Sequence, residues 1–108
     1  MQYIEEQHFQ LAHTQIKSLL GNTLHSFRRD TESGLYHILV YQDEILKTSW
    51  EWAVEDTVQT YLDVGVSKEM TKFIKLEELD NTFRVSATGP WVLEQIARMA
   101  KKHHNKNK

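Results

Sequence analysis

The apolar residues near the N-terminus recur with the spacing of an amphipathic helix. Between Tyr3 and Leu20 they stand mostly three, four or seven positions apart, with polar side chains between them: Ile4, Phe9, Ala12, Ile16, Leu19 and Leu20. In a helix of 3.6 residues per turn this spacing places them on one face. Gly21-Asn22 follows the last apolar position, and glycine readily takes the left-handed conformation that ends a helix. The pattern therefore predicts a helix that ends near Leu20.

From Thr23 onward the pattern changes to that of a β-hairpin. Thr23–Arg29 and Leu35–Tyr41 each have the composition of a strand, and the five residues between them, DTESG, are typical of a turn. The second segment is almost continuously apolar. That composition predicts a central strand that is covered on both faces.

The segment that follows fits either strands or a helix. Apolar and polar residues alternate in Ile45–Val54 and again in Thr57–Val66, so we expect two further strands there. The competing interpretation is a helix, because four apolar residues stand four positions apart: Trp50, Val54, Val58 and Leu62. Periodicity alone does not decide between the two structures for residues 47–64.

The last third of the chain carries clearer boundaries. Ser67 has the side chain of a helix N-cap, whereas Ile74 and Leu76 alternate like strand residues. Asp80-Asn81 supplies turn chemistry ahead of the alternating segment TFRVSATG, so we expect a hairpin that closes at these two residues. The only proline, Pro90, precedes an amphipathic stripe and predicts the first turn of a C-terminal helix.

This order of elements predicts an α+β fold. The connections are too short for successive parallel crossovers, so we expect an antiparallel sheet of about five strands flanked by an N-terminal and a C-terminal amphipathic helix. A chain of 108 residues is long enough for one core, and we expect a single compact domain over residues 1–102. Residues 103–108, HHNKNK, offer no apolar side chain to bury and are expected to form a disordered basic tail.

The tryptophans suggest either a core or a contact surface. On the strand interpretation, Trp50 and Trp52 share one face of the sheet and are buried. The alternative is an exposed aromatic platform, in which Trp52 has the acidic neighbours Glu51, Glu55 and Asp56. Such a surface would suit a protein partner that carries basic residues, and it would repel nucleic acid.

Charge is distributed unevenly along the chain. Residues 30–63 hold eight acidic residues and one base, a net charge of −7, whereas residues 95–108 hold five bases and no acid. These bases are the polyanion-binding candidates of an alternative function, a nucleic-acid-binding accessory protein: Arg98, Lys101, Lys102, Lys106 and Lys108. The same separation suits a homo-oligomer, in which the acidic segment of one subunit meets the basic segment of another.

No pattern in the sequence indicates a catalytic or metal site. His8 and His13 are five residues apart, about 140° around a helix, and no HExxH, GxSxG or glycine-rich phosphate loop occurs. Zero cysteines exclude disulfides and thiolate ligands. We therefore expect no catalytic residue, metal or cofactor.

Composition favours a cytoplasmic accessory or regulatory role. The chain is 40% hydrophobic and 26% charged, as is usual for globular domains. No apolar run approaches the roughly eighteen residues that span a membrane, and the N-terminus lacks the features of a signal peptide. The interpretation that results is a small cytoplasmic protein that acts by protein–protein binding, without a membrane partner.

Overall fold

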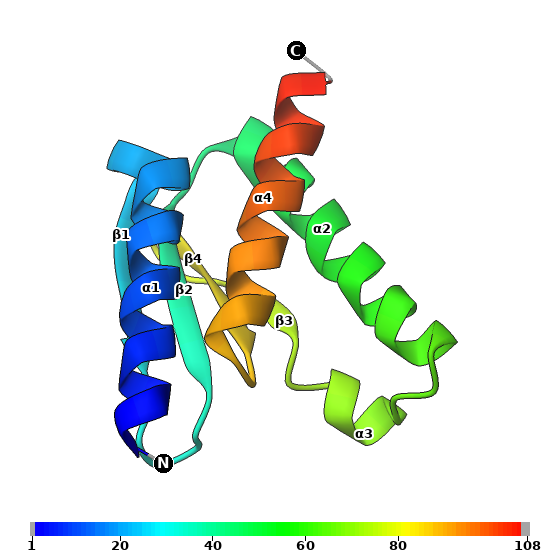
Figure 1. Ribbon diagram of the computed structural model, residues 1–108. Helices are drawn as coiled ribbons and strands as arrows, with labels where there is room; N and C mark the ends of the chain where they lie inside the picture. Colours follow the sequence, from blue (N-terminus) through cyan, green and yellow to red (C-terminus); the bar gives the residue numbers. More distant parts are fainter. Residues whose placement is uncertain (1, 107–108) are drawn as a thin grey trace.

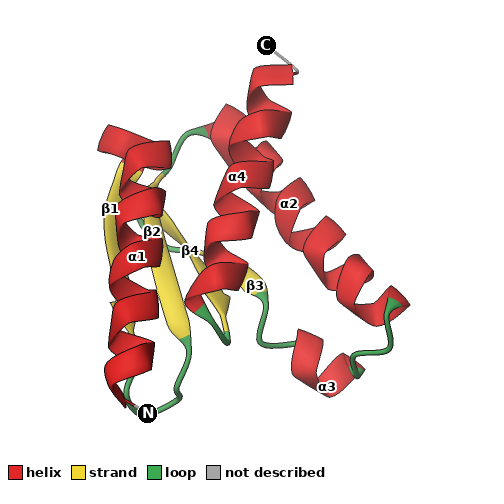
Figure 2. Cartoon of the chain, viewed as in Figure 1, coloured by secondary structure: helices red, strands yellow, loops and turns green. Residues whose placement is uncertain are grey.

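The computed structural model describes residues 2–106, which form four α-helices and a four-stranded sheet. Figure 1 shows α1, α4 and α2 in front of the sheet, with α4 in the middle, and Figure 2 shows α3 set apart beyond the end of α2. The elements in chain order are α1 (Gln2–Leu20), the 3-10 turn η1 (Gly21–Thr23), β1 (Leu24–Arg29), β2 (Tyr36–Tyr41), α2 (Glu44–Asp63), α3 (Lys68–Thr71), β3 (Lys75–Glu78), β4 (Thr82–Ala87) and α4 (Pro90–Lys106).

The strands form one antiparallel sheet in the order β1-β2-β4-β3. The predicted α+β class, the single compact domain and the antiparallel sheet are confirmed, whereas the predicted strand number of about five exceeds the four in the described residues. The predicted central position of the second strand is also confirmed. Its burial alternates, however: Ile38 is fully buried and its neighbours His37 and Leu39 are half-buried, so the strand is not equally covered on both faces.

One face of the sheet and the three long helices enclose the core. The ring of Phe9 in α1 stacks on Phe27 of β1, with centroids 4.7 Å apart. Trp50 of α2 meets Phe83 of β4 edge-on at 5.8 Å. The helix α4 buries four aliphatic side chains in the same cluster: Leu93, Ile96, Ala97 and Ala100. Burial of this apolar surface is the main source of stability in a chain without disulfides.

The helix α2 is the largest departure from the sequence prediction. The strands expected over Ile45–Val54 and Thr57–Val66 are wrong, and the helical alternative is right. The buried side chains of this segment are three or four residues apart, which is the period of a helix face: Ser49, Trp50, Ala53, Val54 and Thr57. The segment appeared to alternate like a strand because Trp52, which is exposed in the structure, was taken as a core residue. Two positions along a helix correspond to about 200°, so Trp50 and Trp52 point in nearly opposite directions.

Local signals at the other boundaries predicted the structure well. The first helix ends at Leu20 and Gly21 has a φ of 52°, in the left-handed region. The Ser67 hydroxyl accepts a hydrogen bond from the backbone N–H of Met70 and caps α3, while the next residues form β3. The hairpin between β3 and β4 closes around residues 79–81. Pro90 is the first residue of α4, as its position after Gly89 predicted.

The C-terminal helix is longer than the sequence predicted. We expected residues 103–108 to be a disordered tail, but α4 continues to Lys106, and His103 and His104 are half-buried. Disorder is therefore wrong for residues 103–106, whereas residues 107–108 lie outside the described part of the chain. The extra turn brings His103 against α2, a contact that a local sequence pattern does not reveal.

Candidate protein-binding surface

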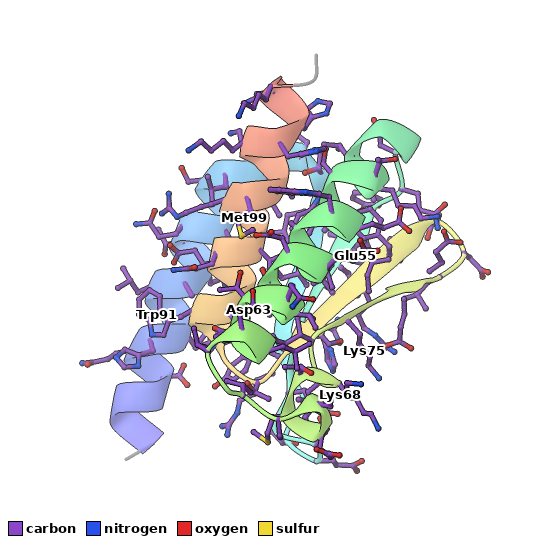
Figure 3. All side chains as sticks on the ribbon, turned by 90° about the vertical axis from the view of Figure 1, so that its right-hand side faces the viewer. Glu55, Asp63, Lys68, Lys75, Trp91 and Met99 are labelled. Atoms are coloured by element: carbon purple, nitrogen blue, oxygen red, sulfur yellow. The ribbon has the colours of Figure 1, made fainter. Side chains whose placement is uncertain are left out.

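The four residues predicted to contact a partner lie together on α2. Glu51, Trp52, Glu55 and Asp56 are all exposed. Glu51 and Glu55 are four residues apart and form one row, and Trp52 and Asp56 form the adjacent row. In the predicted strand, Trp52 would point to the opposite face from Glu51 and Glu55. In the helix, all of these side chains lie on one exposed surface. We call these four residues the α2 acidic face; Figure 3 labels Glu55 and, at the end of the helix, Asp63.

Contacts with the C-terminal helix hold Trp52 in place. Its ring stacks on the imidazole of His103, with centroids 4.4 Å apart and planes 20° apart. The same histidine forms a hydrogen bond through Nδ1 with Ser49 Oγ, at 3.0 Å. Trp52 is nevertheless 41% exposed. It is thus a positioned aromatic ring that still presents part of its surface to solvent.

Three exposed apolar side chains lie in the segment that follows α2. Val64, Met70 and Phe73 are 73%, 53% and 42% exposed. They belong to residues 64–73, a segment that includes α3, and Figure 2 shows α3 beyond the end of α2. Sequence reasoning missed them, because apolar residues between two predicted strands resemble core residues. Large exposed apolar side chains of this kind can contribute to an interaction site.

The basic residues of the C-terminal segment lie on α4, and two of them hold the helices together. Arg98 donates hydrogen bonds to Glu94 of its own helix at 3.0 Å and to Gln15 of α1 at 3.4 Å. Lys101 donates one to the backbone carbonyl of Leu19 at 2.9 Å, near the C-terminal end of α1, where a cation is favourable. The remaining predicted cations on this helix, Lys102 and Lys106, are exposed, and Lys108 lies outside the described residues.

A groove runs along α4 beside these cations. It has a volume of about 530 Å³. Leu19 of α1 and Met99 of α4 contribute apolar surface to it, and the basic residues that line it are Arg98, Lys101 and Lys102. The groove therefore combines apolar and cationic surface, which suits an apolar side chain with an acidic neighbour.

On the other face of the sheet, polar side chains pair across the strands. His37 Nδ1 lies 2.7 Å from Ser86 Oγ, and Arg84 donates a hydrogen bond to Glu77 at 3.0 Å. Each pair joins residues that are directly opposite in the strand register. Burial, and secondarily the charge of Arg84, lowers the pKa of His37, while the hydrogen bond from Arg84 lowers the pKa of Glu77. These contacts stabilise the sheet, and no catalytic role follows from them.

The lowered pKa of His37 predicts a loss of stability at mildly acidic pH. Near pH 7 the ring is mostly neutral in both states. Below the ordinary histidine pKa of about 6.5 the unfolded chain binds the proton first, so the free energy of unfolding falls until the lower folded pKa is reached. Urea denaturation between about pH 7 and pH 5 should therefore show a smaller decline for His37→Gln than for the wild type. The control is His25→Gln, at an exposed position on β1; equal slopes for the wild type and His37→Gln would contradict the prediction.

The described residues show no arrangement that would bind a metal. No group of three or more histidine, aspartate or glutamate side chains among them is placed to hold an ion. His8 packs edge-on against Trp91, with centroids 5.5 Å apart, and His13 lies 5.4 Å from Phe27. Among the helices that the structure describes, none has the length and apolar character needed to cross a membrane.

Comparisons with known proteins do not assign a function. The chain matches no protein-family model, no curated protein and no solved structure. A function must therefore be inferred from the surfaces themselves, and the sequence indicated two of them: the α2 acidic face and the basic residues of α4.

Proposed function

We propose that this chain is a small accessory or regulatory protein that acts by binding another protein through the α2 acidic face. One observation carries the proposal: three carboxylates and a positioned indole are exposed together within about two turns of one helix. No catalytic role is proposed. A chain without cysteine needs no oxidising compartment, so we place this activity in the cytoplasm.

The chemistry of the surface specifies the partner. Carboxylates on a helix attract lysine and arginine side chains, and complementary charge accelerates association and fixes orientation. The exposed part of the Trp52 ring can accept a cation over its face. The apolar residues Val64, Met70 and Phe73 would add contact area for a partner that also carries apolar side chains.

Nucleic-acid binding by the C-terminal helix is less well supported. Arg98 and Lys101 already form hydrogen bonds within the chain. The acidic helix α2 packs beside α4, and its carboxylates would repel phosphates that approach Lys102 or Lys106 from that side. For these reasons the protein-binding function is preferred.

Charge reversal on α2 tests the proposal. The variant is Glu51→Lys/Glu55→Lys/Asp56→Lys, and the wild type and variant are immobilised and exposed to extract from the natural host. A protein captured by the wild type is then purified, and its dissociation constant is measured for each form. We expect the variant to bind at least about tenfold more weakly, because attraction is replaced by repulsion.

A second triple variant controls for net charge. Glu6→Lys/Glu32→Lys/Asp80→Lys changes the charge by the same amount at exposed positions outside α2 and α3. It should bind the partner almost as well as the wild type. Equal loss of binding in both variants would show that net charge matters and not the α2 acidic face, and unchanged binding in the α2 variant would contradict the proposal.

A further inference from the structure

The helices α2 and α4 lie side by side and antiparallel, and the contacts between them show which of their residues are level with one another. Ser49 and Trp52 of α2 both contact His103 of α4. Further along, Thr57 Oγ1 donates to the sulfur of Met99 at 3.6 Å. Trp52 therefore lies level with residue 103 of α4, and residue 56 lies near the level of residues 99–100.

Each of these helices presents one row of exposed side chains. On α2 the row consists of Trp52 and Asp56, which are four residues apart. On α4 the row consists of Arg98, Lys102 and Lys106, also four apart and exposed. The groove along α4 lies beside this basic row and is lined in part by Leu19 and Met99. The residues that line this groove belong to α1 and α4.

We propose that this groove binds the Trp52–Asp56 row of a second copy of the chain, and that the resulting dimer is symmetric. A twofold axis that runs parallel to α4 between the two copies would place the α2 row of each copy opposite the α4 row of the other. Each residue would keep its height along the axis. Trp52 and Asp56 of each copy then lie over residues 98–103 of the other, where the groove and the cations are found. A twofold interface contains every contact twice, so each complementary pair contributes double.

The proposed contacts fit the chemistry of the two rows. The indole of Trp52 would bury its exposed part against the apolar lining, and tryptophan is a frequent anchor residue of interfaces. Asp56 would lie beside Lys102, which is exposed, and salt would weaken the attraction between the two charges. The inference rests on the proposed function, because it names a partner for two residues of the α2 acidic face.

Single charge reversals provide a sharp test by sedimentation velocity over a concentration series. The wild type should form dimers at about 0.1 M salt, and about 1 M salt should weaken them. Asp56→Lys alone and Lys102→Asp alone should each raise the dissociation constant at least about tenfold, because each creates two repulsive contacts per dimer. The double variant Asp56→Lys/Lys102→Asp should dimerise again. A mixture of the two single variants should form heterodimers, since both contacts then join opposite charges.

Two single charge reversals elsewhere on the surface serve as controls. Glu32→Lys and Lys72→Asp, at exposed positions away from both rows, should dimerise like the wild type, and circular dichroism should show that all variants are folded. A monomeric wild type, unaffected single variants or a mixture that stays monomeric would each overturn the inference, and open-ended oligomers would overturn the twofold arrangement.

The outcome of the dimerisation test can be distinguished from the outcome of the capture test for the proposed function. If the wild type is monomeric but the triple reversal on α2 still abolishes capture of another protein, self-association fails and the proposed function stands. If Asp56→Lys abolishes dimers while the triple reversal leaves capture of another protein intact, the dimer stands and the proposed hetero-partner surface fails.

Discussion

Trp50→Ala is expected to lower the free energy of unfolding by about 3–5 kcal/mol. The side chain is 1% exposed and is one of the largest fully buried groups in the protein. It lies between α2 and the sheet, where its ring meets Phe83 edge-on. Truncation to alanine removes this contact and leaves a cavity among residues that cannot all move to fill it. Urea denaturation monitored by circular dichroism measures the change.

The matched control is the neighbouring tryptophan on the same helix. Trp52→Ala removes a ring of the same size, but one that is 41% exposed and that stacks on His103. An aromatic pair of this kind contributes about 0.5–1.5 kcal/mol beyond the apolar area that it buries, so the loss of stability should be clearly smaller than for Trp50→Ala. Equal losses for the two substitutions would contradict the helical assignment of α2, because a strand would bury both rings on one face.

The elements that the sequence predicted correctly are those with strong local signals. A polar five-residue turn between two apolar segments defined the first hairpin, and Pro90 marked the start of α4. The end of α1 was predicted by Gly21, whose backbone takes the left-handed conformation. These features depend on residues close together in the chain, so their physical cause is visible in the sequence.

The failures concern contacts between residues that are far apart in the chain. Whether Trp52 is buried depends on α4, since its stacking partner His103 is about fifty residues away. Once Trp52 was counted as a core residue, the segment appeared to have a strand period. Likewise, the order of strands in the sheet places His37 opposite Ser86, a pairing that no local motif indicates.

The candidate site was predicted in composition but not in geometry. The sequence identified Glu51, Trp52, Glu55 and Asp56 from their charge and proximity, which do not depend on secondary structure. The helix then placed all four on one exposed surface. The basic residues show the converse: Lys101 was assigned to a polyanion surface, and its hydrogen bond to the end of α1 appears only in the folded chain.

Truncation after Lys102 is expected to lower the free energy of unfolding by about 1–3 kcal/mol. Removal of residues 103–108 deletes the stack of His103 on Trp52 and the hydrogen bond between His103 and Ser49. Each contact contributes about 0.5–1.5 kcal/mol. From the sequence alone this segment was expected to be a disordered tail, whereas α4 continues to Lys106 in the structure.

Two further variants separate the histidine contacts from the effect of chain length. Truncation after Lys106 removes neither contact and should leave the melting temperature nearly unchanged. His103→Ala in the full chain should reproduce most of the loss, because it deletes the ring and keeps the lysines. If truncation after Lys102 proved as stable as the full chain, Trp52 would not be held by α4. The positioned indole on which the α2 acidic face depends would then be a mobile side chain, and its value as an anchor for a partner would be much reduced.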